Sequence, residues 1–420
     1  MDTMGKLLLF FTASLCLYLL VAFVYIFHKY WCIPRRTQLI LNSQGIRGPP
    51  YEFIHGNNKQ VFQLQREASS RPLGLSHDIF PRVRPHFHHW INKYGKIHLS
   101  WNGVRAQLVI AEPELVKENM TPAIIASVET MLEKWKGKEV EEIDVYQDGI
   151  WKSAEEIETE KLAKTIHDTV MKIVRKREEK VVTGETESFG HDFLGLLVNA
   201  YHESDEKIRL SEQDLVDECK TFYFAGHETT NSLLAWTFLL LATHTDWQDK
   251  ARTEVFQVLG NQNPDLEAIA KLKIINMIIN ETLRLYPPAN GTIRKVGREV
   301  RLGKLALPTP LELDIRIIAL HHDPDLWGPD VHLFKPERFA EGVAKATNYN
   351  AAAYLPFGLG PRSCVGMSFA ITETKMALSM ILQRYSFTLS PAYVHSPVTR
   401  LVLKPEHGLQ LLFRSLHADA

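Results

Sequence analysis

The chain has 420 residues, of which 45% are hydrophobic and 23% are charged. This composition is typical of globular proteins with a large core, and 23 glycines and 21 prolines are too few for a collagen-like or disordered chain. The 48 basic and 49 acidic residues leave a formal net charge of −1, so nothing points to nucleic acid as a partner. Four scattered cysteines are too few for a disulfide framework.

The first segment is predicted to be a membrane anchor that contacts lipid. Residues 7–27 form a run of 21 residues without a charge. As a helix this run would be about 31 Å long at ~1.5 Å per residue, which matches a hydrocarbon core of ~30 Å. A cleaved signal peptide, the alternative, would have an apolar region of only ~7–15 residues and a small-residue cleavage site. Here Lys29, Tyr30 and Trp31 follow a longer run, which favours the anchor.

The charges beside the anchor predict its orientation. One lysine precedes it, whereas Lys29, Arg35 and Arg36 follow it. The positive-inside rule therefore predicts a single-pass protein whose remaining chain faces the cytosol. Thiols stay reduced there, and the three Asn-x-Thr sequences should remain unglycosylated.

Two short patterns come next. Residues 45–50 contain two prolines, which fix φ and exclude a helix, so we expect residues 31–50 to be a basic, proline-rich hinge before a globular domain of residues 51–420. Residues 97–110 alternate between apolar and polar on both sides of Asn102-Gly103, which predicts a β-hairpin.

Helical patterns dominate the rest of the chain. Thr121-Pro122 is predicted to open one helix, and another is marked by apolar residues at Leu162, Ile166, Val170 and Ile173. A long helix is predicted from Ser211, which forms a capping box with Asp214, to Thr243. Its apolar part, residues 233–242, is too short for a second membrane span. Helices over residues 273–286 and 367–385 complete a mainly α fold with minor β.

The most informative stretch is the glycine-rich loop of residues 357–366, with Cys364 near its end. Its glycines permit close backbone approach to a flat ligand, and Phe357 could cover one side of that ligand. Free N–H groups and the N-terminus of the following helix favour the thiolate form of Cys364. Such a thiolate, with Arg362 nearby, suits an axial ligand to haem iron. The alternative is a buried structural cysteine in a turn.

A second motif, Ala225-Gly226-His227-Glu228-Thr229-Thr230, lies in the middle of the long predicted helix. Acid, hydroxyl and glycine are poor choices for a buried helix interior, so they suggest a site rather than core. Gly226 would leave a groove for a diatomic ligand or water, Thr229 could hydrogen-bond a distal oxygen, and Glu228 could relay protons. An ordinary polar interruption is the alternative.

The spacing Phe-x-x-Gly-x-Arg-x-Cys-x-Gly, together with the helix motif, resembles the cytochrome P450 family. The blocks AGHETT and YLPFGLGPRSCVG are similar to those of the plant clan that contains secologanin synthase and cytokinin hydroxylases. The resemblance implies the cytochrome P450 fold and haem b (iron protoporphyrin IX) with Cys364 as its axial ligand. Residues implied to bind the haem are Arg294, Arg362, Phe357, Gly360, Gly366, Ala225 and Gly226.

Further residues receive roles through the same resemblance. Glu228 and Thr229 are implied to deliver protons that break the O–O bond. Glu281 and Arg284 are spaced i and i+3 on one helix, where the simple interpretation is a surface ion pair. The resemblance instead implies a buried network with Arg338, structural rather than catalytic.

The chain departs from the family in length. Between the positions of Asn119 and Thr121, where this chain has only Met120, the family has a helix pair with a Trp-x-x-x-Arg motif. A second stretch is absent near Ile150. The Trp-x-x-x-Arg at Trp101 falls in the predicted hairpin and is accidental. Loss of these helices would open the haem edge to water, so the chain is interpreted as a shortened form with impaired haem retention.

Clustered histidines at 86, 88 and 89 raise the question of a metal site. No cysteine or carboxylate accompanies them at ligand spacing, so a solvated helix near the membrane is the preferred interpretation. His321 and His322 are likewise interpreted as structural.

The resemblance, together with the predicted anchor, implies a monooxygenase in the endoplasmic reticulum membrane that inserts one oxygen atom from O2 into a hydrophobic terpenoid or hormone-like molecule. Its electrons would come from NADPH through a membrane-bound reductase, since no flavin or nicotinamide fingerprint is present. The alternative is a truncated, catalytically impaired membrane-anchored relative. A haem-thiolate isomerase or dehydratase is disfavoured because it would have no use for Glu228 and Thr229.

Overall fold

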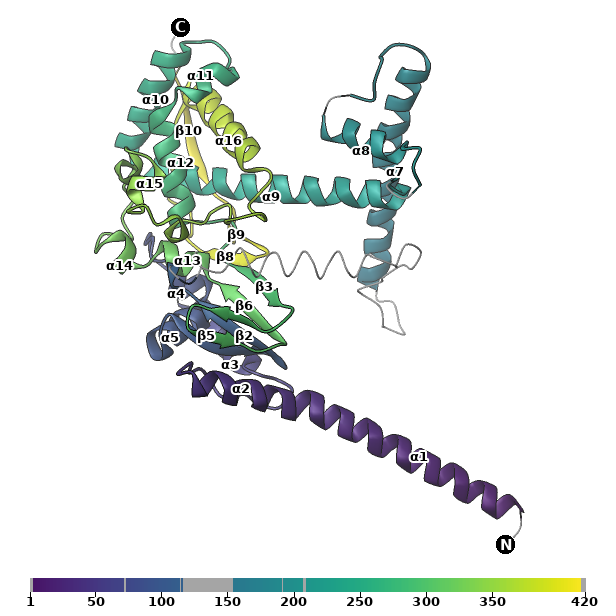
Figure 1. Cartoon of the computed structure of the whole chain (residues 1–420). Coiled ribbons are helices and arrows are strands. Elements are labelled where there is room, and N and C mark those ends of the chain that lie inside the picture. Colours follow the sequence, from purple (N-terminus) through teal and green to yellow (C-terminus); the bar gives the residue numbers. More distant parts are fainter. Residues whose placement is uncertain are drawn as a thin grey trace. The chain divides into compact units, whose positions relative to one another are not determined.

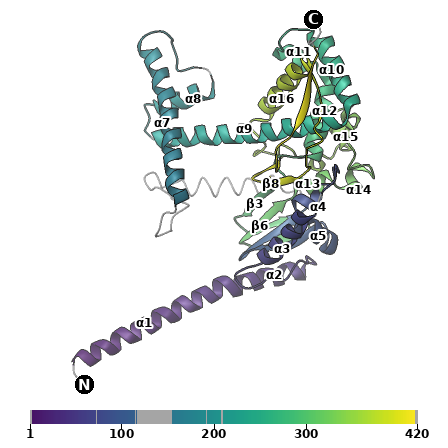
Figure 2. The same cartoon turned by 180° about the vertical axis from the view of Figure 1, so that it is seen from behind.

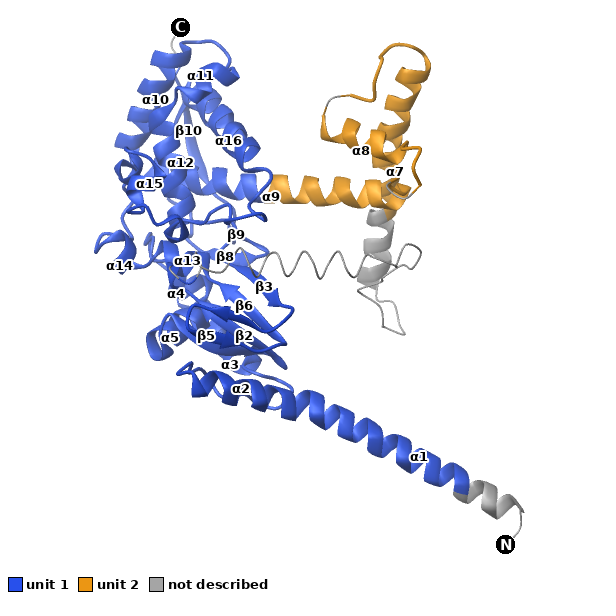
Figure 3. Ribbon diagram, viewed as in Figure 1, with its two compact units in different colours: residues 1–137, 229–420 blue, residues 138–228 orange. Residues whose placement is uncertain are grey.

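The computed structural model describes residues 3–71, 73–113, 115, 154–190, 192–206 and 209–416. The chain divides into two compact units, one of residues 1–137 with 229–420 and one of residues 138–228 (Figure 3). We call them unit 1 and unit 2 and describe each by itself. The helix predicted at Thr121 and the chain around Asn119 and Ile150 lie outside the described residues.

Unit 1 begins with the predicted apolar helix. Helix α1 (Thr3–Phe27) passes through a π-helical turn, η1 (His28–Cys32), into α2 (Ile33–Ser43) without a break. Its large apolar side chains are exposed from Phe10 to Phe27. Residues 10–43 are the one helical stretch, among those described, that is long and apolar enough to cross a membrane. By length and composition this helix fits the predicted anchor.

The segment predicted as a hinge packs against the globule. It is helical to Ser43 and non-helical from Gly45 to Pro50, where the prolines stand. A Cβ on Gly48 would lie 1.8 Å from the carbonyl oxygen of Leu99, so only glycine allows this close approach. Leu41 is fully buried. Leu41 and Gly48 of the predicted hinge therefore pack against the globular part of unit 1.

A four-stranded sheet in unit 1 has the order β1-β2-β6-β3 (Figure 1). The predicted hairpin is confirmed: β1 (Ile97–Asn102) pairs antiparallel with β2 (Arg105–Ile110), and Gly103 in the turn has φ +57°. Strand β2 pairs parallel with β6 (Leu311–Ile315), which pairs antiparallel with β3 (Thr292–Val296). Apolar side chains of β1, β2 and β6 form one core cluster with Leu41 of α2.

The remaining helices of unit 1 enclose a larger core (Figure 2). Its centre contains Trp236 stacked on Tyr286, with ring centroids 4.4 Å apart. The helices are α3 (Asn58–Ser70), α4 (Phe80–Val83), α5 (Pro85–Tyr94), α10 (Thr245–Leu259), α11 (Leu266–Ala270), α12 (Lys273–Leu285), α13 (Ile317–His321), α14 (Pro324–Trp327), α15 (Val343–Ala346) and α16 (Met367–Leu382), with 3-10 turns η2 (Pro336–Phe339) and η3 (Ala351–Ala353).

Three two-stranded antiparallel sheets complete unit 1. They are β4 (Val300–Leu302) with β5 (Leu305–Leu307), β7 (Tyr385–Leu389) with β10 (Leu411–Ser415), and β8 (Pro397–Arg400) with β9 (Val402–Pro405). The helix predicted to reach Tyr385 ends at Leu382, because residues 385–389 alternate as a strand and pair with β10.

The long predicted helix is confirmed as α9 (Glu212–Thr243), which contributes to both units. Its capping box is present: the Ser211 and Asp214 backbone N–H groups each donate to the other residue's side chain, both at 3.1 Å. The helix remains α-helical through Gly226.

Unit 2 contains α7 (Ala154–Val182), α8 (Phe193–Tyr201) and the first part of α9. Its small core includes Met171 and Val174 of α7. The amphipathic helix is therefore confirmed, but the predicted face is partly wrong, since Ile166 and Ile173 are 46% and 48% exposed. The buried stripe runs through residues 171 and 174, and of the predicted residues Val170 packs against it.

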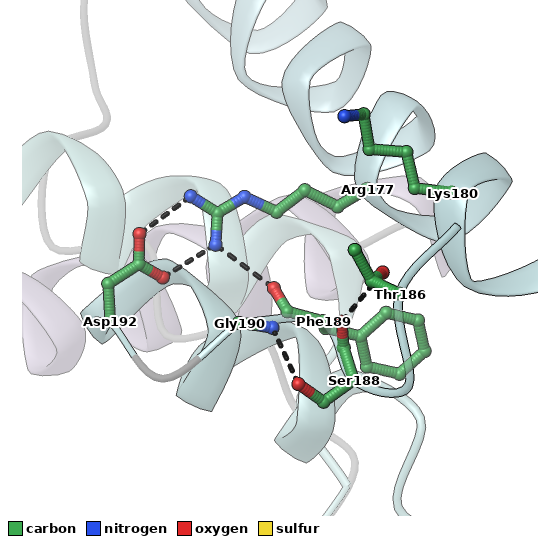
Figure 4. A pocket seen from close by; sticks show the side chains of 7 residues that line it. All are labelled: Arg177, Lys180, Thr186, Ser188, Phe189, Gly190 and Asp192. Carbon is green, nitrogen blue, oxygen red and sulfur yellow. Dashed lines mark hydrogen bonds and ion pairs between the residues drawn. The ribbon is translucent and has the colours of Figure 1, made fainter. Parts of the chain in front are cut away.

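A hollow of about 300 Å³ in unit 2 holds charged groups that satisfy one another (Figure 4). Arg177 donates to both carboxylate oxygens of Asp192, at 2.5 and 2.6 Å, and to the carbonyl oxygen of Phe189 at 3.0 Å. Asp192 also accepts from the Gly195 N–H at the start of α8. These hydrogen bonds connect α7 to the start of α8, so the role of this hollow is structural.

Candidate functional site

The cysteine loop of unit 1 is shaped by its glycines and by one backbone hydrogen bond. Gly358 and Gly360 have φ +75° and +81°, in the left-handed region that glycine tolerates. The Cys364 N–H donates to the carbonyl oxygen of Phe357 at 2.8 Å, which closes the loop. Gly366 then precedes the first residue of α16. The loop therefore presents Cys364 at the N-terminus of a 16-residue helix.

The thiol of Cys364 is free and exposed, and so are the apolar side chains that follow it. Val365 is 85% exposed and Phe369 66% exposed. Phe357 is half-buried and packs on the main core. Exposed apolar residues beside a thiol at a helix N-terminus suit a flat apolar ligand with a metal for the sulfur to bind.

Two arginines of unit 1 act on each other electrostatically. Arg294 on β3 donates to the Thr292 hydroxyl at 2.6 Å and to the Ile293 carbonyl at 2.9 Å. Burial lowers the pKa of the Arg294 guanidinium, and the positive charge of Arg362 lowers it further. The Arg294 Nε is buried and has no hydrogen-bond partner among the described residues. Two neighbouring cations with an unused donor favour a dianionic ligand.

These features fit haem. Cys364 could supply a sulfur ligand, the exposed residues beside it an apolar surround, and Arg294 with Arg362 two positive charges for the two carboxylates of a porphyrin.

The second motif lies within α9, where the two units join between Glu228 and Thr229. Ala225 is exposed, whereas Gly226, Glu228 and Thr229 are half-buried. The Glu228 carboxylate lies 3.6 Å from the His227 Nδ1. Ala225, Gly226 and Glu228 belong to unit 2, and Thr229 belongs to unit 1 with the cysteine loop.

The pair Glu281–Arg284 on α12 is fully buried, unlike the surface pair that spacing alone suggests. Arg284 donates from Nε and Nη2 to the two oxygens of Glu281, each at 2.8 Å. Its Nη1 donates to the carbonyl oxygen of His321 at 3.0 Å. Glu281 also accepts from the Lys335 N–H at 3.0 Å. Each nitrogen of the Arg284 guanidinium therefore has a hydrogen-bond partner inside the core.

Arg338 joins this pair from η2. Its Nε lies 3.6 Å from Glu281, and its two terminal nitrogens donate to the carbonyl oxygens of Trp327 and Asp330 at 2.9 and 2.7 Å. The structure thus brings together all three residues that the sequence analysis grouped.

Buried hydrogen bonds connect α12 and α13 to the chain that enters the cysteine loop. The Tyr354 hydroxyl donates to the Asn280 carbonyl at 2.9 Å, and the Leu355 N–H donates to His321 Nε2 at 2.9 Å. Burial lowers the pKa of His321 to about 3, so its imidazole is neutral and can accept. Sequence reasoning missed Tyr354 and Asn280, since no spacing links residues 74 positions apart.

The histidine-rich helix differs from the solvated helix that was predicted. His86 on α5 is 4% exposed, with its ring centroid 4.3 Å from that of Phe87. Burial lowers its pKa to about 3. Among the three histidines of this helix, His89 is the exposed one. The prediction was wrong because Pro85 starts the helix with His86 on the side that faces Trp90.

Comparison with known proteins gives one family. The family model described as "Cytochrome P450" matches residues 118–413. "Cytochrome P450 CYP749A22" of Panax ginseng is 44% identical over 507 positions, which cover 97% of each chain. "Cytochrome P450 734A1" of Arabidopsis thaliana is 33% identical, and "11-oxo-beta-amyrin 30-oxidase" of Glycyrrhiza uralensis is 34% identical, over 93% and 92% of this chain and 94% of each relative.

Proposed function

This chain belongs to the cytochrome P450 family, and we propose that it inserts one oxygen atom from O2 into a terpenoid or hormone-like molecule. Family membership makes it a plant-type cytochrome P450 monooxygenase that depends on haem iron. The finer substrate class rests on the resemblance to a protein named as an amyrin oxidase. Haem b is the form of the cofactor that we propose.

Cys364 would hold the haem iron, and the loop around it would hold Cys364 in place. The closing hydrogen bond from the Cys364 N–H to the Phe357 carbonyl oxygen fixes the backbone at Cys364. Gly360 and Gly366 keep the backbone free of side chains there. Arg294 and Arg362 would bind the haem carboxylates, and Phe357, Ala225 and Gly226 would contact the macrocycle. When bound, haem iron supplies the reductive activation of O2.

Thr229 and Glu228 would supply protons to the reaction at the haem iron. Adjacent on α9, they offer a hydroxyl that donates a hydrogen bond and a carboxylate that exchanges protons with solvent. Gly226, one turn before Thr230, leaves space that a larger side chain would occupy. Glu281, Arg284 and Arg338 have a structural role in this proposal.

The anchor suggests the setting and the electron donor. We propose that α1 places the protein in the endoplasmic reticulum membrane with residues 51–420 in the cytosol, where the positive-inside rule puts them. Electrons would then come from NADPH through the membrane-bound cytochrome P450 reductase on the same face. Apolar substrates would reach the enzyme from the lipid.

The observation that carries this proposal is the cysteine loop beside the paired arginines. To test it, the purified chain is combined with reductase, NADPH and a panel of triterpenoids and plant hormones. We expect NADPH-dependent formation of a product heavier by one oxygen atom from a panel member that also shifts the haem spectrum on binding. Conversion that proceeds without NADPH would instead support an isomerase or dehydratase.

A second candidate, a form with impaired haem retention, has its own support. The alignment with the ginseng protein spans 507 positions, whereas this chain has 420 residues. Because that alignment covers 97% of both chains, most positions without a residue here are internal. Haem content per chain should be compared with that of a version restored near Asn119 and Ile150. Equal haem content in both would refute impaired retention.

A further inference from the structure

Three side chains that the proposed reaction does not use converge in unit 1. Asp78 lies just before α4, His322 just after α13, and His332 in the turn after α14. One ligand atom from each residue lies within 4.8 Å of the other two. Their separation along the chain explains why no spacing motif reveals the cluster.

His322 carries the main evidence. It is 5% exposed, and its Nε2 lies 2.9 Å from the carbonyl oxygen of Leu285. A carbonyl can only accept, so Nε2 bears the hydrogen and Nδ1 bears the lone pair. Nδ1 is buried and has no hydrogen-bond partner within the described chain. An imidazole held by a backbone carbonyl at one nitrogen, with the other nitrogen bare, is the usual state of a metal-ligating histidine.

His332 and Asp78 provide the other two donors and an open side. The His332 ring centroid is 5.4 Å from that of His322, and its Nε2 is 3.8 Å from Asp78 Oδ1. These two side chains are 37% and 45% exposed, so solvent reaches them. Arg284, a cation that acts on His322, is compensated by its two hydrogen bonds to Glu281.

We propose that Asp78, His322 and His332 bind a divalent transition-metal ion of the Zn²⁺ class. Two imidazole nitrogens and one carboxylate oxygen suit Zn²⁺, whereas Mg²⁺ and Ca²⁺ prefer oxygen donors alone. Tetrahedral bonds of ~2.0–2.1 Å need ligand atoms roughly 3.4 Å apart, which modest rotations of the two exposed side chains supply. Water completes the coordination from the open side.

Such an ion would join segments that are distant in sequence. It would connect Asp78, before α4, with His322 and His332, which follow α13 and α14. The expected effect is therefore resistance to unfolding, with no part in oxygen chemistry.

The test measures zinc on the full-length, haem-loaded protein in detergent. The protein is incubated with Zn²⁺, separated from free ion, and analysed for zinc and haem by mass spectrometry and absorption. We expect wild type to retain about one more zinc per chain than Asp78→Asn or His332→Gln. We also expect Zn²⁺ to raise the unfolding midpoint of wild type but not of either variant.

The matched control is His407→Gln. His407 lies 3.8 Å from Glu406 in an exposed histidine–carboxylate pair outside the cluster, so this variant should retain zinc like wild type. The comparison is repeated in a Cys364→Ser background, which removes the thiol as a zinc ligand and makes the result independent of haem retention. Equal zinc in wild type, Asp78→Asn and His332→Gln would overturn the proposal.

Discussion

Arg294 is held close to a second positive charge, and its buried Nε lacks a partner within the described residues. We expect Arg294→Leu to weaken haem binding about 10–100-fold, since hydrogen bonds to charged groups are worth ~1.5–3 kcal/mol. Haem transfer to an acceptor protein, followed by absorption, measures this. Arg301→Leu, an exposed arginine on β4, is the control. Unchanged haem transfer from Arg294→Leu would remove Arg294 from the haem site.

Thr229 and Thr230 are neighbours with different surroundings. Thr229 is half-buried, whereas the Thr230 hydroxyl is buried and without a hydrogen-bond partner among the described residues. We expect Thr229→Ala to lower product formation roughly 10²-fold, the scale of a lost proton donor, while NADPH is still consumed. Thr230→Val preserves volume and should leave the ratio of product to NADPH unchanged. The same ratio in Thr229→Ala as in wild type would refute the proton role.

At the scale of elements, the ion pair on α12 connects that helix to η2 and to the last residue of α13. Glu281→Gln removes the charge that compensates fully buried Arg284. We expect a loss of about 3–5 kcal/mol in the free energy of unfolding, because an uncompensated buried cation remains. Chemical denaturation measures it. Glu267→Gln, which breaks the exposed pair with Lys271, should change little. Similar losses in both variants would contradict the buried network.

Local patterns in the sequence predicted the elements well. The Asn102-Gly103 turn and the Ser211–Asp214 cap are set by contacts between near neighbours, and both are confirmed. The parallel pairing of β2 with β6 joins residues about 205 positions apart, and no local pattern indicates it. The end of α16 was also predicted wrongly. Tyr385 belongs to strand β7, which pairs with β10, and the local pattern does not indicate that pairing.

For the whole molecule, buried neutral histidines predict acid sensitivity. Burial lowers the pKa of His86 and of His321 to about 3, against ~6.5 in the unfolded chain. Between these values the unfolded chain binds more protons, so stability is full above pH 6.5 and falls as the pH drops toward 3. Each histidine contributes up to ~1.4 kcal/mol per pH unit.

The measurement is the unfolding midpoint at pH 7 and pH 5. We expect His86→Gln to lose part of the difference that wild type shows between the two values. His89→Gln, on the exposed side of the same helix, should keep the full difference. An equal pH dependence in wild type and His86→Gln would show that His86 titrates normally.

The candidate site was predictable only in part, because some of its contacts join residues that are far apart in the sequence. Cys364 and its loop lie in one continuous stretch, so their chemistry can be inferred from spacing. The contact of Tyr354 with Asn280 and the convergence of Asp78 on His332 depend on the folded chain. Neither apolar periodicity nor charge spacing predicts contacts between residues that are distant in the sequence.

The most direct test of the central claim is the spectrum of the reduced carbon monoxide complex, recorded for wild type and for Cys364→Ser. If Cys364 ligates the iron, wild type shows the absorption band of a thiolate-ligated haem, and the serine variant loses it. An unchanged band in Cys364→Ser would contradict the account.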